Sequence, residues 1–192
     1  MTDEELIWQR RSSRAGPRLP LFDVRLDEME HPLSGDVLSR LVLSSVDWVN
    51  MVALTESGES VMVRQFRFGV GYPTLETPGG MVDPGEDSLT AARRELAEET
   101  GYSGGHWHYL GAVEPNPAIH DHLCHHWLAE GVVQTGVPEP TPGEHIEVTL
   151  MSEAAVRDAV VDGTIRHALS CEDARENAVL PGVLKCRFIV GA

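Results

Sequence analysis

Alternation of hydrophobic and polar residues marks the N-terminal part of the chain as strand-forming. Runs rich in β-branched and aromatic residues are separated by clusters of turn-forming residues, which is the punctuation expected of β-hairpins. The runs cover residues 19–26, 37–45, 49–54 and 61–68, with turns at 31–35 and 56–59. The pattern predicts two consecutive hairpins, preceded by a polar lead-in over residues 1–17 that we expect to be frayed or helical.

The hydrophobic period lengthens from two residues to about 3.6 after a glycine-rich loop at residues 78–80. Across residues 87–100, Leu89, Ala92 and Leu96 share one face of a predicted helix. Further strands are predicted at 107–113, 123–133 and 146–150, further helices at 152–161 and 168–178, and an exposed Pro-rich loop at 136–143. Strands with helices segregated around them indicate an α/β or α+β sandwich.

Composition restricts the classes of protein to which the chain can belong. With 42% hydrophobic and 23% charged residues it is globular, and no run approaches the ~18 apolar residues of a membrane span. The N-terminal segment lacks the apolar core of a secretory signal, and Cys124, Cys171 and Cys186 show no paired spacing. We therefore expect the protein to reside in the reducing cytoplasm. A net charge of -15 argues against nucleic acid as a partner.

The helix predicted at 87–100 carries three glutamates beside its hydrophobic face. Glu95, Glu98 and Glu99 fall within roughly a third of the helix circumference. Like charges at this spacing repel one another unless a cation lies between them, and hard ions such as Mg²⁺ prefer oxygen ligands. A solvent-exposed acidic helix would explain the three residues without any metal. Arg94 is within reach of Glu98 and is expected to orient these carboxylates rather than to react.

The whole segment 79–102 decides between these interpretations. Its sequence, GGMVDPGEDSLTAARRELAEETGY, resembles the Nudix signature G-x5-E-x7-R-E-U-x-E-E-x-G-U at every specified position. Those positions are Gly80, Glu86, Arg94, Glu95, Leu96, Glu98, Glu99, Gly101 and Tyr102. Tyr102 is aromatic where an aliphatic residue is usual. The resemblance implies the Nudix fold, a mixed β-sheet sandwiched between helices, and a hydrolase of nucleoside diphosphates linked to another group.

The same resemblance implies roles for individual residues. The expected ligands of Mg²⁺ or Mn²⁺ are Glu95, Glu98, Glu99 and the backbone carbonyl of Gly79, and Glu95 and Glu99 are also expected catalytic residues. Glu86 and Arg94 are expected to be accessory. Metal ions in such a site neutralise and orient a pyrophosphate and lower the pKa of water, so that hydroxide attacks phosphorus at neutral pH.

Segments outside the signature resemble the ADP-ribose pyrophosphatase branch of the family. This resemblance spans roughly residues 19–169 and rests on the segments 63–67 and 75–80, with Pro115 and Pro117. It implies three parts after the lead-in: a dimerising hairpin at 18–46, the Nudix domain at 47–180 and a C-terminal tail at 181–192. The expected partners are a small nucleotide substrate and a second copy of the chain, with neither nucleic acid nor membrane involved.

Substrate contacts are expected outside the signature. By the resemblance Arg67 would reach a substrate phosphate, although pairing with Glu76 is an equal alternative, and Glu76 is itself a candidate substrate contact. Trp48 would stack on a base or pack within the fold. Asn116 or His125 would meet the sugar end, and a zinc or copper site among the neighbouring histidines is disfavoured because strand alternation separates them.

The general base is expected in the loop leading to the strand at 146–150, where this branch carries it. Strict alternation turns Glu144 towards the hydrophobic face and Glu147 away from it, with Glu139 as a third candidate. The expected reaction is Mg²⁺-dependent cleavage of ADP-ribose to AMP and ribose 5-phosphate. The alternatives are another Nudix specificity and a Nudix-fold binding protein without catalysis.

Overall fold

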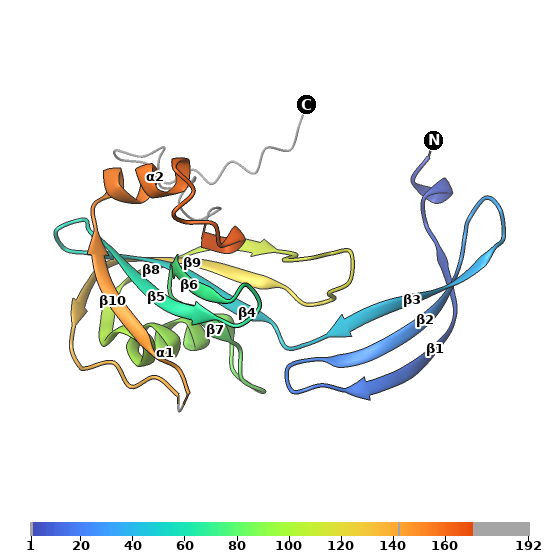
Figure 1. Cartoon of the computed structure of the whole chain (residues 1–192), viewed down its shortest axis with the longest axis horizontal. Helices are drawn as coiled ribbons and strands as arrows, with labels where there is room; N and C mark the ends of the chain where they lie inside the picture. The colour runs from blue at the N-terminus through green and yellow to red at the C-terminus, as the bar shows by residue number, and fades with distance from the viewer. Residues whose placement is uncertain (1, 142, 171–192) are drawn as a thin grey trace. The chain divides into compact units, whose positions relative to one another are not determined.

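The computed structural model describes residues 2–141 and 143–170, and the chain divides into two compact units (Figure 1). The first unit comprises Met1–Val46 and Glu114–Leu123, and the second comprises Asp47–Val113 and Cys124–Ala192. Most of the helix predicted at 168–178 and the whole tail at 181–192 lie outside the described residues. In the part that is described, no helix is long and apolar enough to cross a membrane.

The first unit is a three-stranded antiparallel sheet with the strand order β1-β2-β3. Its elements are the 3-10 helix η1 (Asp3–Glu5) and the strands β1 (Gln9–Arg18), β2 (Asp23–Glu30) and β3 (Val37–Ser44). The first predicted hairpin is therefore present, but the frayed or helical lead-in expected over 1–17 is wrong for most of its length. The strand β1 has no hydrophobic alternation because it is an edge strand whose polar side chains bond across to β2. For example, Arg11 donates to Glu30 at 2.7 Å.

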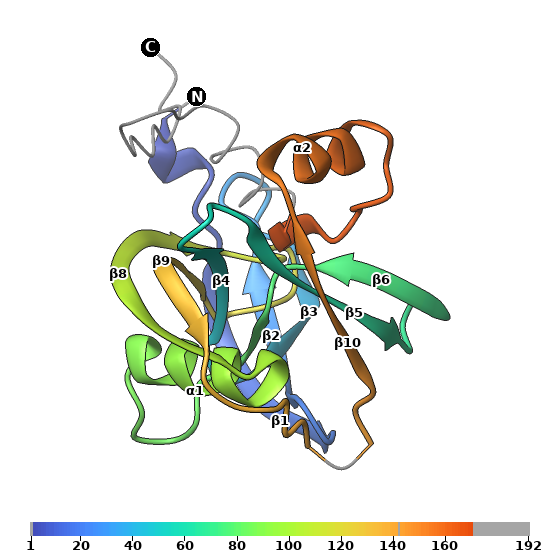
Figure 2. The same ribbon diagram turned by 90° about the vertical axis from the view of Figure 1, so that its left-hand side faces the viewer.

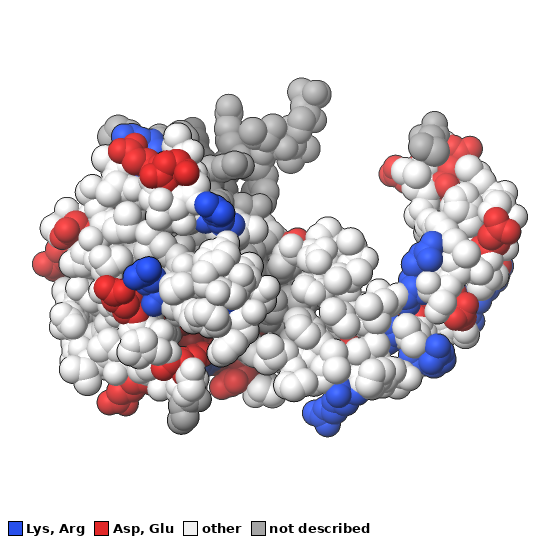
Figure 3. Space-filling model, viewed as in Figure 1, with Lys and Arg blue, Asp and Glu red and all other residues white. Residues whose placement is uncertain are grey.

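Charged side chains of both signs lie along the strands of the first unit (Figure 3). The Arg25 guanidinium donates to the Asp121 carboxylate at 3.1 Å, and the Ser44 hydroxyl donates to the same oxygen at 2.7 Å. Asp121 belongs to the segment Glu114–Leu123. These bonds therefore fasten that distant segment to the sheet formed by β1, β2 and β3.

The second unit is a mixed β-sheet between two helices (Figure 2). Its strands follow the order β10-β5-β4-β9-β8, with β6 beside β5 and β7 beside β4. The β4–β9 pair is parallel and the other pairs are antiparallel. The elements are β4 (Trp48–Thr55), β5 (Ser60–Arg67), β6 (Tyr72–Glu76), β7 (Gly79–Met81), α1 (Ser88–Thr100), β8 (Tyr102–Val113), β9 (Cys124–Gln134), β10 (Ile146–Met151) and α2 (Glu153–Val161). The expected mixed sheet with helices around it is confirmed.

Two hydrophobic cores lie on the two faces of this sheet. The core beneath α1 consists of Val49, Met51, Ala53, Val61, Ala91, Ala92, Leu96, Ala129 and Val132. The core beneath α2 consists of Met62, Val156, Ala159 and Ile165. Because Val61 and Met62 are neighbours on β5, their side chains point to opposite faces and anchor one helix each.

Local sequence sets both ends of α1. Asp87 is the N-cap, and its carboxylate accepts from the amides of Leu89 and Thr90 at 3.0 and 2.9 Å. Gly101 ends the helix with φ 74°, a left-handed conformation that glycine adopts without steric cost. The helix predicted at 87–100 is therefore confirmed, with its first residue serving as the cap.

The strands β4 and β5 pair only next to their connection and then separate. Their one register pair joins Leu54 to Ser60. Beyond it β6 pairs with β5, and β7 pairs with β4. Between β6 and β7 the chain passes through Thr77 and Pro78 and so moves from the side of β5 to the side of β4. This crossing from β6 to β7 places Gly79 beside β4.

Candidate active site

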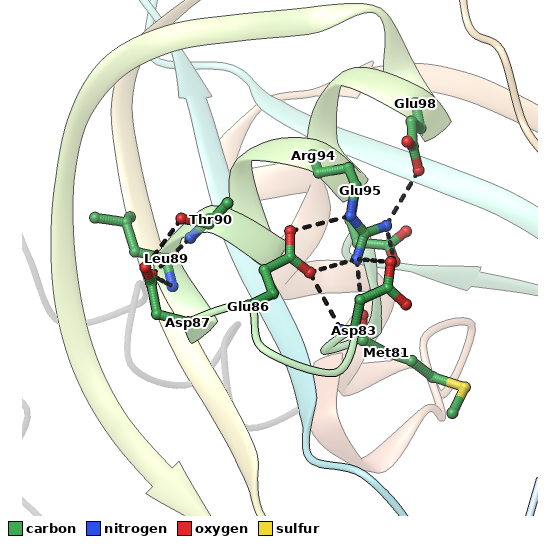
Figure 4. A network of polar contacts seen from close by, with 9 residues as sticks. All are labelled: Met81, Asp83, Glu86, Asp87, Leu89, Thr90, Arg94, Glu95 and Glu98. Atoms are coloured by element: carbon green, nitrogen blue, oxygen red, sulfur yellow. Dashed lines mark hydrogen bonds and ion pairs between the residues drawn. The ribbon is translucent and has the colours of Figure 1, made fainter.

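Arg94 of α1 holds the loop of residues 81–86, which runs from the end of β7 towards α1, to the helix (Figure 4). Its Nε and Nη2 donate to the two oxygens of Glu86 at 3.2 and 3.0 Å, and Nη2 also donates to the Met81 carbonyl at 2.9 Å. Its Nη1 donates to Glu95 at 2.8 Å and to Glu98 at 3.2 Å. One rigid guanidinium thus joins the loop to two carboxylates of the helix.

The contacts of Arg94 keep the network ionised. Hydrogen bonding to Glu86 raises the pKa of Arg94, and the hydrogen bond from Arg94 in turn lowers the pKa of Glu86. Both side chains therefore carry charge at neutral pH. This arrangement supports an orienting role for Arg94 and an accessory role for Glu86.

Glu99 is buried under the glycine-rich loop. The Gly79 amide donates to its Oε2 at 3.0 Å. Burial raises the pKa of Glu99 to about 8, against the effect of the Gly79 hydrogen bond, because the protein solvates the carboxylate poorly. The negative charge of Glu95 raises it further. A buried carboxylate in this state favours a bound proton or a bound cation.

Gly80 faces the carboxylate of Glu95. A Cβ atom at Gly80 would overlap that carboxylate, so a larger residue fits only if the Glu95 side chain moves. Burial raises the pKa of Glu95 as well, and the hydrogen bond from Arg94 offsets part of that rise. Glu98 is the more accessible acid of the helix, with 42% of its side chain exposed.

The carboxylate oxygens of Glu95, Glu98 and Glu99 suit a hard divalent cation as ligands. The carboxylates of Glu95 and Glu99 are poorly solvated, and a cation bound between them would compensate their charge. Oxygen ligands of this kind are those that Mg²⁺ and Mn²⁺ prefer. Among the described residues, no three acidic, histidine or cysteine side chains are already arranged to hold a metal ion. Arg94 bonds one oxygen each of Glu95 and Glu98, which leaves the other oxygen of each carboxylate available to a cation.

Arg67 of β5 pairs with Glu76 of β6. Its Nε and Nη2 donate to the two oxygens of Glu76 at 2.9 and 2.6 Å, and the Thr74 hydroxyl donates to the same carboxylate. Burial by itself would raise the pKa of Glu76, but the contacts with Arg67, His167 and Thr74 bring it below its ordinary value. The pairing considered for Arg67 is therefore observed. Its side chain remains 43% exposed, and contact with a phosphate stays a prediction.

The three candidates for the general base have different surroundings. Glu147 lies opposite Arg64 in the β10–β5 register, with its carboxylate 3.5 Å from the guanidinium. Glu139 is joined to α1 through its backbone, since its amide donates to the Glu98 carbonyl at 2.8 Å. Glu144 is exposed just before β10, and its carboxylate accepts from the Thr141 amide at 3.1 Å. Its charge adds to burial in raising the pKa of Glu95 and Glu99.

The remaining predicted contact residues are dispersed. Trp48 is half-buried at the start of β4, which favours packing. Asn116 belongs to the first unit, whereas the acids of α1 belong to the second. His125 uses both ring nitrogens within the second unit, with the Tyr109 hydroxyl at 2.9 Å and the Asp47 carboxylate at 3.1 Å.

One group of polar residues near the site was not predicted from the sequence. Thr77 bonds both Asn50 of β4 and Ser170, and Ser170 in turn bonds His167. Both His167 and Ser170 follow α2. Ser170 falls within the helix predicted at 168–178 and His167 directly precedes it. Their role depends on contacts with residues far away in the chain, and the hydrophobic periodicity of the sequence does not reveal such contacts.

Comparisons with known proteins identify the family of the chain. The family model described as NUDIX domain matches residues 46–169. The chain is 31% identical over 155 residues to an ADP-ribose pyrophosphatase of Mycobacterium tuberculosis, covering 78% of this chain and 73% of that protein. It is 30% identical over 131 residues to a methanol dehydrogenase activator of Bacillus methanolicus, covering 66% of this chain and 70% of that protein.

A solved structure shows that the fold is shared as well. The crystal structure of an ADP compounds hydrolase superposes with a TM-score of 0.76 at 18% identity, covering 88% of this chain and 90% of that one. The family and enzyme class expected from the signature are therefore confirmed. The chain belongs to the Nudix family, in its ADP-ribose pyrophosphatase branch, and is a pyrophosphohydrolase.

Proposed function

We propose that the protein cleaves ADP-ribose to AMP and ribose 5-phosphate in a reaction that depends on Mg²⁺ or Mn²⁺. The observation that carries the proposal is the placement of two poorly solvated carboxylates against Gly79 and Gly80: the buried Glu99 accepts from the Gly79 amide, and the half-buried Glu95 faces Gly80. Burial raises the pKa of both. The name of the mycobacterial relative supports ADP-ribose as the substrate.

The cation would be held by Glu95, Glu98, Glu99 and the Gly79 carbonyl. When bound, it supplies positive charge to the pyrophosphate and lowers the pKa of water. Arg94 and Glu86 keep the loop and the helix in place around these ligands. The site therefore needs a separate group to take the proton of the attacking water.

Two residues outside the helix complete the proposed machinery. Glu144 is the proposed base that accepts the proton of the attacking water, because its negative charge contributes to raising the pKa of Glu95 and Glu99 on α1. Arg67 holds Glu76 through Nε and Nη2, and its Nη1 is the proposed contact to a substrate phosphate. Trp48, Glu76, and Asn116 or His125 remain secondary candidates for substrate contacts.

The assembly is proposed to be a cytoplasmic homodimer formed through the first unit. Val37 and Leu41 lie on one face of β3 and are 49% and 43% exposed, which is consistent with a covered surface. Size-exclusion chromatography with light scattering tests this point. A monomer at micromolar concentration would refute it.

A substrate panel with Glu99→Gln tests the proposed function. Purified protein is assayed with ADP-ribose, GDP-mannose, UDP-glucose, diadenosine polyphosphates and deoxynucleoside triphosphates, with and without EDTA. We expect ADP-ribose to be preferred and EDTA to stop its cleavage. Glu99→Gln should retain the fold and lose the Mg²⁺-dependent release of AMP. A wild-type rate in Glu99→Gln would refute the metal assignment. Preferential cleavage of another compound would refute ADP-ribose as the substrate and identify that compound instead.

A further inference from the structure

A buried polar network lies where β4 and β5 separate. Its buried members are Asn50 on β4, Glu76 at the end of β6, Thr77 directly after it, and Ser170 beyond the C-terminus of α2. His167, with 31% of its side chain exposed, borders the network. Most buried polar groups in proteins are hydrogen-bonded, and the members of this network bond one another, although the Nδ2 atom of Asn50 has no hydrogen-bond partner among the described residues.

Ser170 is the junction of this network. Its hydroxyl oxygen accepts from the Thr77 amide at 3.0 Å and lies 3.1 Å from the Thr77 hydroxyl. The Thr77 hydroxyl donates to the Asn50 side chain at 3.1 Å, so the Ser170 hydroxyl is the donor to Thr77. His167 Nδ1, at 3.0 Å, then donates to Ser170. One hydroxyl accepts two hydrogen bonds and donates one, which is its full capacity.

The grouping of serine, histidine and glutamate is not a nucleophilic triad. Glu76 approaches His167 at Nδ1, 3.8 Å away, and the Ser170 hydroxyl contacts the same nitrogen. A triad requires the two partners on opposite ring nitrogens. Ser170 is also only 1% exposed and lies out of reach of a substrate. The network can support the chain but cannot attack a substrate.

The supported segment is the crossing from β6 to β7. Besides the pairing of β7 with β4, three hydrogen bonds hold its backbone: from the Thr77 amide to Ser170 at 3.0 Å, from the Met51 amide to the Pro78 carbonyl at 3.1 Å, and from the Gly79 amide to Glu99 at 3.0 Å. Of these, only the first depends on a side chain from beyond α2. Only Pro78 separates Thr77 from Gly79, and its ring fixes one of the few dihedral angles between them, so a displacement of Thr77 reaches Gly79.

We propose that Ser170, supported by His167, is a positioning residue that holds the Gly79 backbone in place for the divalent cation. This inference rests on the proposed function, in which Gly79 and Glu99 bind the metal. Without the Ser170 hydroxyl, the Thr77 amide loses a buried acceptor, and the crossing moves to find another. Gly79 then loses its alignment with Glu99, while the acids themselves are unchanged.

Amide hydrogen exchange in the metal-free protein tests the positioning directly. Ser170→Ala is expected to accelerate exchange of the Thr77 and Gly79 amides by about tenfold, because local opening of the crossing becomes easier. The control is Ser60→Ala, which removes a buried hydroxyl from β5 outside the network. Equal exchange rates at the crossing in the two variants would overturn the proposal.

Titration with Mn²⁺, followed by electron paramagnetic resonance, tests the consequence for the cation. Loss of an outer supporting group typically weakens metal binding ~10–100-fold, and we expect this for Ser170→Ala but not for Ser60→Ala. Ser170→Thr keeps the hydroxyl and should bind more tightly than Ser170→Ala. Unchanged Mn²⁺ affinity in Ser170→Ala would overturn the proposal even if exchange is faster.

A second variant covers the case in which Ser170→Ala does not fold. His167→Phe keeps a ring but removes the donor to Ser170, and its partly exposed position makes it less disruptive. It should shift exchange and Mn²⁺ affinity in the same direction, and wild-type values for both would overturn the proposal. Wild-type Mn²⁺ affinity in Glu99→Gln would instead refute the metal assignment, whereas unaccelerated exchange in Ser170→Ala refutes only the support by Ser170.

Discussion

Replacement of Gly80 by alanine is expected to impair catalysis much more than stability. A Cβ atom at Gly80 would lie 2.6 Å from Oε2 of Glu95 and closer still to the other carboxylate atoms. Ordinary van der Waals contact begins at about 3.4 Å, so the carboxylate must move by roughly 1 Å. The obstacle is the end of a flexible side chain rather than backbone, and the chain can yield there.

The size of the effect follows from that displacement. Misplacing a reacting group by about 1 Å costs on the order of 100-fold in rate, which corresponds to about 2.7 kcal/mol of transition-state stabilisation. Extra volume in a packed site destabilises proteins by about 1–3 kcal/mol, and we expect the lower end because the Glu95 side chain can move. The hydrogen bond from Arg94 to Glu95, at 2.8 Å, would also be disturbed.

Steady-state kinetics of ADP-ribose cleavage against Mg²⁺ concentration measure this prediction. Gly69→Ala is the matched control, because a Cβ atom at Gly69 meets nothing within 4 Å and its φ is not positive. We expect kcat/KM to fall about 100-fold in Gly80→Ala and to stay near wild type in Gly69→Ala. If Gly80→Ala retains activity within about threefold of wild type with the same Mg²⁺ dependence, the close packing of Gly80 on Glu95 is not needed for the reaction.

Two other predictions concern the identity of the general base and the stability of the protein at low pH. Glu144→Gln should lower kcat by ~10²–10⁴-fold with little change in melting temperature. Glu147→Gln only breaks an exposed ion pair and should leave kcat unchanged. Equal kinetics in the two variants would exclude Glu144 as the base. The Ser13 hydroxyl holds the pKa of Asp27 below its ordinary value, so its contribution to folding is present above the unfolded pKa of about 3.9 and is lost as pH falls through the lower folded pKa. Melting temperature measured from about pH 6 down to about pH 3 should therefore fall less steeply in Asp27→Asn than in wild type, and identical slopes would contradict this assignment.

Local physical rules made the catalytic helix predictable from the sequence. Apolar residues at helical spacing, an N-cap at Asp87 and a terminating Gly101 define α1 without reference to the rest of the chain. The same spacing places Glu95, Glu98 and Glu99 on neighbouring positions, and the signature around them identifies the family. Such features are determined within a few helical turns, which is why periodicity detects them.

Partnerships between distant segments were decided only by the tertiary structure. The strand β1 is polar, and some of its side chains bond charged groups of β2, so its sequence carries no hydrophobic alternation to reveal the strand. The separation of β4 from β5 depends on which strands fill the gap between them. Thr77 and Ser170 bond at 3.0 Å although 93 positions separate them. A hydrogen bond of that kind depends on how the completed sheet and α2 bring two chain segments together, and neither segment alone contains that information.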